Sequence, residues 1–178
     1  MKKDVAEYVG HCYTCQQVKA EHQRPTELLQ PLPVSEWKWY HITMDFVSSL
    51  SRTSRGHNVV WVVVNRLTKS ANFLAMKTTD SLSALSWLYV AEIVSLHGVP
   101  LLVVLDRDLC FVSNFWRGFQ EAMGTQLNFS TTFHPQTNSQ SKRAIQILED
   151  MLRDFILDFG GNWSDYLPLA EFTYNNSF

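Results

Sequence analysis

The chain has the length and composition of one globular domain. It contains 178 residues, of which 46% are hydrophobic and 18% are charged, and a chain of this size buries roughly 70% of its unfolded surface. Its 15 Lys and Arg and 17 Asp and Glu give a formal net charge of -2, which excludes strong binding to DNA or acidic membranes through overall charge alone. Any nucleic-acid binding must therefore come from a local site.

The cysteines and the apolar runs indicate an intracellular, soluble protein. The 3 cysteines, Cys12, Cys15 and Cys110, are an odd number and form no disulfide framework, which fits a reducing compartment. The longest apolar run, residues 59–64, is far shorter than the roughly 20 residues that span a bilayer. We therefore expect no membrane partner.

Composition divides the chain into three parts. Residues 1–24 are polar and charged and predict a short appendage. Three prolines follow at Pro25, Pro31 and Pro33, and they predict a stiff linker over residues 25–36. The main domain then covers residues 37–178.

Strand patterns open the main domain. Apolar and polar side chains alternate over residues 40–46, so that Asp45 is expected on the face of its strand opposite Met44. Two further apolar runs follow after short connections and predict an antiparallel meander, at residues 59–65 and 71–76. The continuous apolar run at residues 101–105 predicts a buried parallel strand, and residues 127–130 predict a short fifth strand.

Helical spacing alternates with these later strands. It predicts a helix over residues 81–96 with Asp80 as its N-cap and a stop at Gly98. Ser113 is predicted to cap a helix that buries one stripe, formed by Phe115, Phe119 and Met123. A long helix is predicted at residues 142–159, with an apolar stripe of Ile145, Leu148, Leu152, Ile156 and Phe159, and a last helix at residues 163–173. The fold class is therefore α/β, with a mixed sheet of about five strands flanked by helices.

Two carboxylates stand where strands are predicted to end. Asp45 belongs to the first strand and Asp106 directly follows the buried fourth. Ligands gather at the carboxyl ends of strands in open α/β sheets, so that two such groups on neighbouring strands could hold Mg²⁺. The alternative is that Asp45 caps a turn and that Asp106 begins a tight bend.

Longer motifs in the chain resemble one known family. The segments are MDFVSSL, VVWVVVNRLTKSANF, EIVSLHGVP, LDRDLCFVSNFW, FSTTFHPQTNSQSKR, IQILEDMLR and LPLAEFTYNNS. Together they resemble the integrase core of gypsy-class long-terminal-repeat retrotransposons, most like plant elements. The resemblance implies a ribonuclease-H-like fold and a nuclear polynucleotidyl transferase. Such an enzyme would act with Mg²⁺ or Mn²⁺ on element ends and target DNA, as a possible homodimer through the core.

The active site implied by the resemblance has lost one acidic residue. The family pattern is an Asp, a second Asp and, after 35 intervening residues, a Glu; Asp45 and Asp106 match the first two, and Lys142 stands at the third position. A cation in place of a metal-binding carboxylate predicts an inactive copy. The resemblance also implies a DNA-binding loop that contains His134, Gln136, Thr137, Asn138, Gln140 and Arg143. Asn65, Asn72 and Ser139 depart from the family pattern, either as signs of a decaying copy or as tolerated changes.

Both ends of the chain look incomplete by the same comparison. Cys12 and Cys15 resemble the cysteine half of the family's zinc-binding domain, although two ordinary thiols are the alternative. At the other end the family continues into one further helix, so that we expect Leu167, Leu169 and Phe172 to be partly uncovered.

Three functions are open from the sequence. The first is the integrase enzyme, and the second is a nonenzymatic DNA-binding or multimerising remnant with one basic side formed by Arg52, Arg55, Lys69, Lys142 and Arg143. The third is a nonfunctional element fragment. The tryptophans are expected in the core, with base stacking considered only for Trp37 or Trp39.

Overall fold

The computed structural model describes residues 2–12, 36–48, 50–105, 109–129 and 139–177. Within these residues five strands form one sheet in the order β3-β2-β1-β4-β5. The strands are β1 (His41–Val47), β2 (Val59–Asn65), β3 (Ala71–Met76), β4 (Leu102–Leu105) and β5 (Gln126–Phe129). The first three are antiparallel and β4 and β5 run parallel to β1, which confirms the predicted meander and the mixed sheet.

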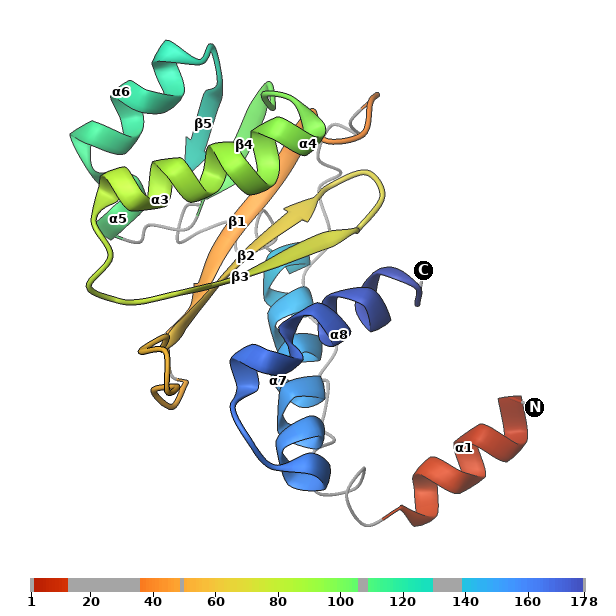
Figure 1. Ribbon diagram of the computed structural model, residues 1–178. Coiled ribbons are helices and arrows are strands. Elements are labelled where there is room, and N and C mark those ends of the chain that lie inside the picture. Colours follow the sequence, from red (N-terminus) through yellow and green to blue (C-terminus); the bar gives the residue numbers. More distant parts are fainter. Residues whose placement is uncertain (1, 13–35, 49, 106–108, 130–138, 178) are drawn as a thin grey trace.

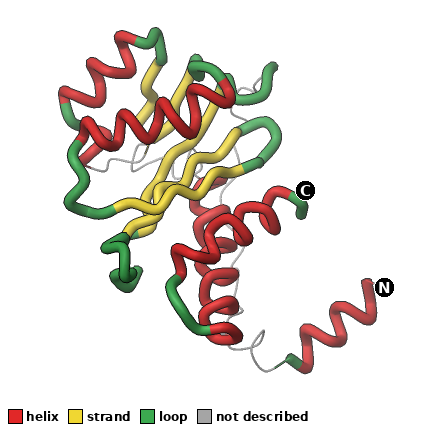
Figure 2. The backbone as a smooth tube through the Cα atoms, in the orientation of Figure 1, coloured by secondary structure: helices red, strands yellow, loops and turns green. Residues whose placement is uncertain are grey.

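Helices cover both faces of this sheet (Figures 1 and 2). One face carries the broken helix of α3 (Leu82–Tyr89), the segment Val90–Val94 and α4 (Ser95–His97), together with α5 (Leu109–Val112) and α6 (Asn114–Ala122). The other face carries α7 (Ser139–Phe159) and α8 (Trp163–Asn175). The N-terminal helix α1 (Lys2–His11) has no buried residue and lies apart from the sheet.

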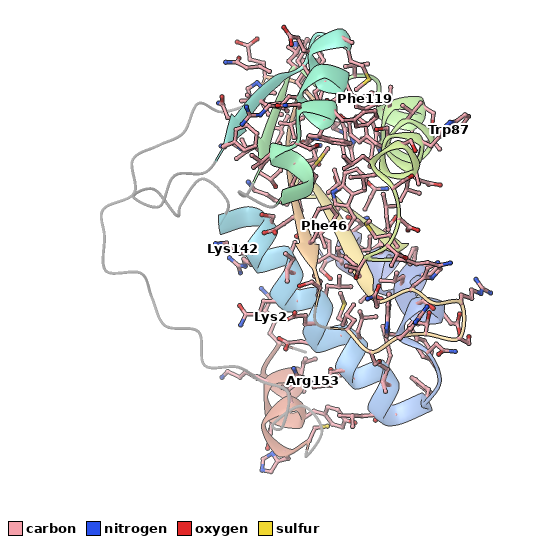
Figure 3. All side chains as sticks on the ribbon, turned by 90° about the vertical axis from the view of Figure 1, so that its left-hand side faces the viewer. Lys2, Phe46, Trp87, Phe119, Lys142 and Arg153 are labelled. Atoms are coloured by element: carbon pink, nitrogen blue, oxygen red, sulfur yellow. The ribbon has the colours of Figure 1, made fainter. Side chains whose placement is uncertain are left out.

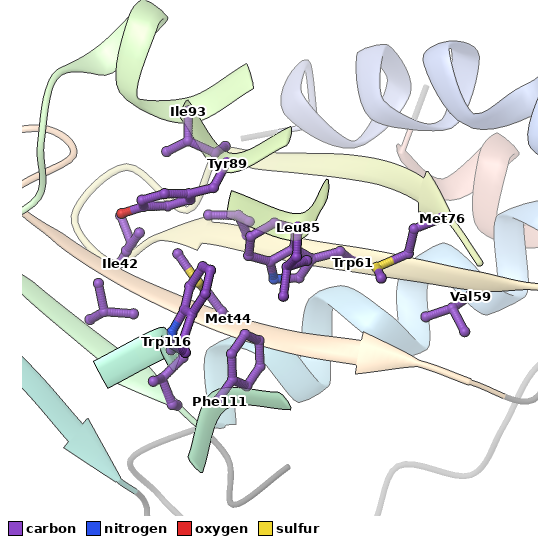
Figure 4. Packing of buried hydrophobic residues seen from close by; sticks show 13 residues of the cluster. Ile42, Met44, Val59, Trp61, Met76, Leu85, Tyr89, Ile93, Phe111 and Trp116 are labelled. Atoms are coloured by element: carbon purple, nitrogen blue, oxygen red, sulfur yellow. The ribbon is translucent and has the colours of Figure 1, made fainter. Parts of the chain in front are cut away.

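The core on the first face is rich in aromatic rings (Figure 4). Trp61 of β2 and Trp116 of α6 are fully buried and meet edge to face, with ring centroids 5.9 Å apart. Phe46 of β1 stacks on Phe111 of α5 at 4.7 Å. Offset and edge-to-face pairs of this kind add to the stabilisation that comes from area burial, so this face fixes β1 firmly in place.

The second core lies between the sheet and the two C-terminal helices. Its residues include Val47, Val60, Val62 and Val64 from the sheet, Ala144, Leu148 and Leu152 from α7, and Trp163, Leu167 and Ala170 from α8. Side chains alternate along a strand, so Thr43 and Asp45 point to the same face as Val47. Asp45 therefore lies on the face that α7 covers, opposite Met44 as predicted.

The helix predicted at residues 81–96 differs from the structure in its cap and its regularity. Ser81 is the N-cap, since its hydroxyl accepts a hydrogen bond from the Ala84 N–H, whereas Asp80 accepts one from the Lys77 N–H. The segment Val90–Val94 forms one wide turn, in which the Ser95 N–H reaches the Val90 carbonyl. This turn rotates the end of the helix out of the predicted phase, so that Leu96 is 65% exposed.

The buried stripes of α6 and α7 are also shifted from the prediction. Ser113 caps α6 as expected, but Trp116 is its fully buried aromatic residue and Phe115 is 48% exposed. Helix α7 begins at residue 139 instead of 142. Its predicted last anchor, Phe159, is 71% exposed because the end of α7 extends past the sheet.

Candidate functional site

Asp45 is the described member of the two predicted catalytic carboxylates. It lies near the end of β1 and is half-buried, opposite Val62 of β2. One carboxylate oxygen, Oδ1, accepts a hydrogen bond of 2.9 Å from the Phe46 N–H.

The second carboxylate, Asp106, lies outside the described residues. The strand that leads to it is described, and β4 runs parallel to β1 with Leu105 paired to Met44. The condition for the two carboxylates to converge, that the first and fourth strands are neighbours, is therefore met. Leu105 is the last residue of β4, and its partner Met44 directly precedes Asp45.

Lys142 lies in the first turn of α7 and is exposed (Figure 3). Its neighbours Ser141 and Ala144 are fully buried, so this turn is seated firmly on the protein. The turn contains no acidic residue. Because a helix N-terminus carries partial positive charge and favours anions, a lysine here adds positive charge where a carboxylate would be stabilised.

The described residues do not form a complete metal site. Among them, no group of three His, Cys, Asp or Glu side chains lies close enough together to hold a metal ion. Glu149 is seven residues beyond Lys142, which corresponds to about 10 Å along the helix axis. Of the two carboxylates expected to hold the metals, the described residues include only Asp45.

The predicted DNA-binding loop is described only at its end. His134, Gln136, Thr137 and Asn138 lie outside the described residues, as does the side chain of Gln140. Arg143 is exposed on the first turns of α7. Burial raises the pKa of Tyr174 in α8 and the charge of the nearby Arg143 guanidinium opposes this rise, so Arg143 of α7 lies near Tyr174.

The predicted zinc ligands are described only in part. Cys12 directly follows α1 and its N–H donates to the Tyr8 carbonyl at 2.9 Å. Cys15 lies outside the described residues.

The five cations predicted to line one DNA-facing side do not lie together at one end of the sheet. Arg52 and Arg55 precede β2, whereas Lys69 follows it. The six residue steps of β2 correspond to about 20 Å, so Lys69 lies at the opposite end of the sheet from the two arginines. The direction of β2 therefore separates these cations along the sheet, and a common DNA-facing side stays a prediction.

Two basic residues that sequence reasoning missed lie beside Lys69. Arg66 follows β2 directly and its N–H donates to the His41 carbonyl at 2.9 Å. The Lys69 Nζ donates to the Arg66 carbonyl at 2.8 Å. The predicted antiparallel pairing of β1 and β2 could have indicated this cluster, because it brings the end of β2 next to the start of β1.

Asn65 has a structural role in the turn that holds these residues. Its side chain is buried, accepts a hydrogen bond from the Leu67 N–H at 3.1 Å and donates to the Thr68 hydroxyl at 2.6 Å. Its own N–H donates to the Ser70 carbonyl. An amide serves both contacts, so position 65 gives no sign of decay.

Most of the aromatic predictions hold, with two exceptions. Trp61, Trp116 and Trp163 are buried, but Trp87 is 77% exposed on α3 and Trp37 is exposed before β1. Trp39 stacks on His97 at 3.7 Å, so that one face of its ring is already covered.

Comparison with known proteins places these features in context. No family model matches the chain. It is 31% identical over 177 residues to the transposon Tf2-3 polyprotein of Schizosaccharomyces pombe, and the match covers 99% of this chain and 13% of that polyprotein. The Tf2-4 polyprotein of the same organism matches equally. The chain thus spans about 13% of the length of the curated relatives it matches.

Solved structures match over the same region. An intasome of simian T-cell lymphotropic virus, in complex with the PP2A regulatory subunit B56 gamma, aligns with a TM-score of 0.67 at 16% identity, over 97% of this chain and 60% of that one. The HTLV-2 integrase catalytic core domain in complex with magnesium, in its dimeric form, aligns at 0.61 and 14% identity, over 78% of this chain and 87% of that one. The chain therefore has the fold of an integrase catalytic core. No helix within the described ranges is both long and apolar enough to cross a membrane.

Proposed function

We propose that this chain is an integrase-type catalytic core that acts on DNA, and that Lys142 prevents metal-dependent strand transfer in this copy. The fold and the similarity to transposon polyproteins support the first part. The observation that carries the second part is the position of Lys142, exposed on the first turn of the helix that covers the Asp45 face of the sheet.

Charge explains why this substitution is severe. An integrase site needs carboxylates because the divalent ions supply the charge that stabilises the attacking and leaving oxygens of a phosphodiester. At about 5 Å and an effective dielectric of about 20, one ammonium group and one Mg²⁺ repel each other by roughly 6 to 7 kcal/mol before screening. Even a neutral lysine amine would be a poor ligand for a hard cation.

A strand-transfer assay with matched variants tests this proposal. The substrate is a labelled DNA duplex with a recessed element end, incubated with target DNA and Mn²⁺ or Mg²⁺. We expect the unaltered chain to give no more product than Asp45→Asn, and Lys142→Glu to give at least about 100-fold more. Lys142→Gln is the control, since it removes the positive charge without adding a carboxylate, and it should stay inactive. Product from the unaltered chain above the Asp45→Asn level would contradict the inactivity.

A second candidate function is DNA binding without catalysis, as a remnant that competes with active integrases. The exposed Lys142 and Arg143 on one helical turn favour it, because together they give two phosphate contacts beside the Asp45 face. It predicts that Lys142→Ala makes the salt dependence of DNA binding shallower, whereas the catalytic proposal alone does not require this.

Finer assignments belong to the same proposal. The motifs favour a gypsy-class, plant-like element, in which residues 1–24 derive from a zinc-binding domain, residues 25–36 are a linker and residues 37–178 are the core. The solved core with magnesium supports Mg²⁺ or Mn²⁺ as the cofactor of an intact site, and its dimeric form supports a homodimer. Action on chromosomal DNA would require a nuclear location.

A further inference from the structure

Three basic side chains converge where β1 begins and β2 ends. Arg66 is bound through its N–H to the His41 carbonyl, and Lys69 reaches back to the Arg66 carbonyl. All three residues are half-buried rather than extended into solvent. We define His41, Arg66 and Lys69 as the basic turn.

The basic turn has no acidic counterpart. Across the described part of the chain no Asp or Glu pairs with the side chain of His41, Arg66 or Lys69. Burial lowers the pKa of Arg66, and burial together with the Arg66 charge lowers the pKa of His41 and of Lys69. In addition, the His41 Nδ1 is buried without a hydrogen-bond partner. Unbalanced positive charge held close together costs stability, and an anion would offset that cost.

The backbone holds the basic turn in a fixed shape. The Asn65 side chain bonds to the turn at Leu67 and Thr68, and the Lys69 N–H donates to the Asn65 carbonyl at 3.0 Å. Lys69 itself has a φ of 68°, in the left-handed region that non-glycine residues rarely adopt. A turn fixed in this way loses little conformational entropy when it binds a ligand.

The position of the basic turn points to DNA rather than to a small anion. His41 and Asp45 lie on the same strand and point to the same face, four residues or about 13 Å apart. That length corresponds to about four base-pair steps of a duplex. Arg143, on the first turns of α7, lies over this face as well.

We propose that His41, Arg66 and Lys69 form a contact site for the phosphate backbone of duplex DNA, continuous with the Asp45 face. This inference rests on the proposed action on DNA and assigns a part of the binding surface to residues outside the catalytic positions. The contacts are to phosphates, so that they add affinity without choosing a sequence.

DNA binding measured at several salt concentrations tests this inference. Fluorescence anisotropy with a labelled 20-base-pair duplex compares the unaltered chain with Arg66→Gln/Lys69→Asn. Asparagine tolerates the left-handed backbone at position 69, and Lys69→Asn alone serves as a second variant that keeps the fold, checked by thermal unfolding. The matched control is Arg52→Gln/Arg55→Gln, which removes the same charge at the opposite end of β2.

We expect the double variant to weaken binding about tenfold at low salt and to reduce the slope of log K against log salt by about 2, at about 0.9 for each lost phosphate contact. The control should change the slope by less than half a unit. Equal effects of the double variant and the control would overturn the phosphate site and leave the proposed function intact. Absence of DNA binding by the unaltered chain would overturn both the phosphate site and the proposed function. A poly-glutamate peptide with the same charge as the duplex that binds as tightly as the duplex would do the same.

Discussion

At the scale of single residues, position 142 affects the chemistry of the proposed site but not the fold. Lys142 is exposed in a turn whose neighbours Ser141 and Ala144 are buried, so that its exchange changes the local charge without changing the packing. Position 171 shows the opposite case, a charged residue whose burial affects stability.

Glu171 should make stability depend on pH. Burial raises the pKa of its carboxyl group, the Phe73 N–H at 2.8 Å opposes this, and the nearby Glu92 adds to the rise. Because the folded pKa lies above the ordinary value of 4.5, the folded state binds the proton more tightly than the unfolded state. The stability from this group is complete below pH 4.5 and is lost as the pH rises through the folded pKa.

We therefore expect Glu171→Gln to raise the melting temperature at pH 7 by about 2 °C, since Gln keeps an acceptor for Phe73 and the partly solvated charge has only a moderate cost. The gain should shrink as the pH falls toward 4.5. Glu121→Gln, on the exposed side of α6, is the control and should show neither effect. A lower melting temperature of Glu171→Gln at pH 7 would contradict this assignment.

Residue-level prediction succeeded where the period of the pattern decided the outcome. Alternation along the first strand correctly placed Asp45 opposite Met44. Residue-level prediction failed where two neighbouring side chains could both cap a helix. Asp80 was predicted as the N-cap of α3, but Ser81 is the cap, because the choice depends on where the first turn begins. The third ligand position followed from family spacing and not from any physical pattern.

At the scale of elements, α8 closes the edge of the sheet. β3 is an edge strand, and both backbone groups of Ala71 bond to the Asn175 side chain, N–H to Oδ1 at 2.8 Å and Nδ2 to the carbonyl at 2.9 Å. Further along, Glu171 accepts from Phe73. These side chains occupy groups that would otherwise be free to pair with another strand.

Asn175→Ala should lower the free energy of unfolding by about 2 kcal/mol, because two hydrogen bonds to an edge strand are lost together. Chemical denaturation measures the change. Asn176→Ala is the matched control, since the Asn176 side chain bonds only within its own helix, to the Phe172 carbonyl at 2.9 Å. If both variants lose the same stability, α8 does not protect the edge.

Most of the helices and strands were predictable because the spacing of apolar residues within each segment distinguishes a helix from a strand. The wide turn Val90–Val94 was not predicted, although the five-residue step from Leu88 to Ile93 matches it. The stripe of α6 was misplaced because Trp116 and Phe115 are both apolar, and only the tertiary position of Trp61 decides which one is buried.

At the scale of the whole molecule, the net charge of -2 conceals a separation of charge. Basic residues lie at both ends of β2, and His41, which lies beside those at the Lys69 end, shares a face with Asp45. Exposed apolar side chains gather elsewhere, with Leu169 and Phe172 on α8 both exposed, Phe172 at 68%. Leu167, which was expected to be uncovered with them, is buried.

The exposed face of α8 predicts self-association. Phe172 lies beside a cavity of about 500 Å³ between β3 and α8, so that an apolar side chain borders a recess that another chain could fill. Sedimentation velocity should show association that increases with concentration, and Phe172→Asp should reduce it. Trp87→Asp, on the opposite layer, is the control and should not. A chain that remains monomeric at all concentrations, with a sharp two-state melt, would contradict the prediction.

The central claim is that Lys142 removes a divalent-metal site from an otherwise integrase-like core, and Mn²⁺ binding tests it most directly. Electron paramagnetic resonance counts the Mn²⁺ ions bound to the unaltered chain, Lys142→Glu and Lys142→Gln under identical conditions. We predict that Lys142→Glu binds two ions and that the other two proteins bind at most one, more weakly. Two tightly bound Mn²⁺ ions in the unaltered chain would contradict the claim.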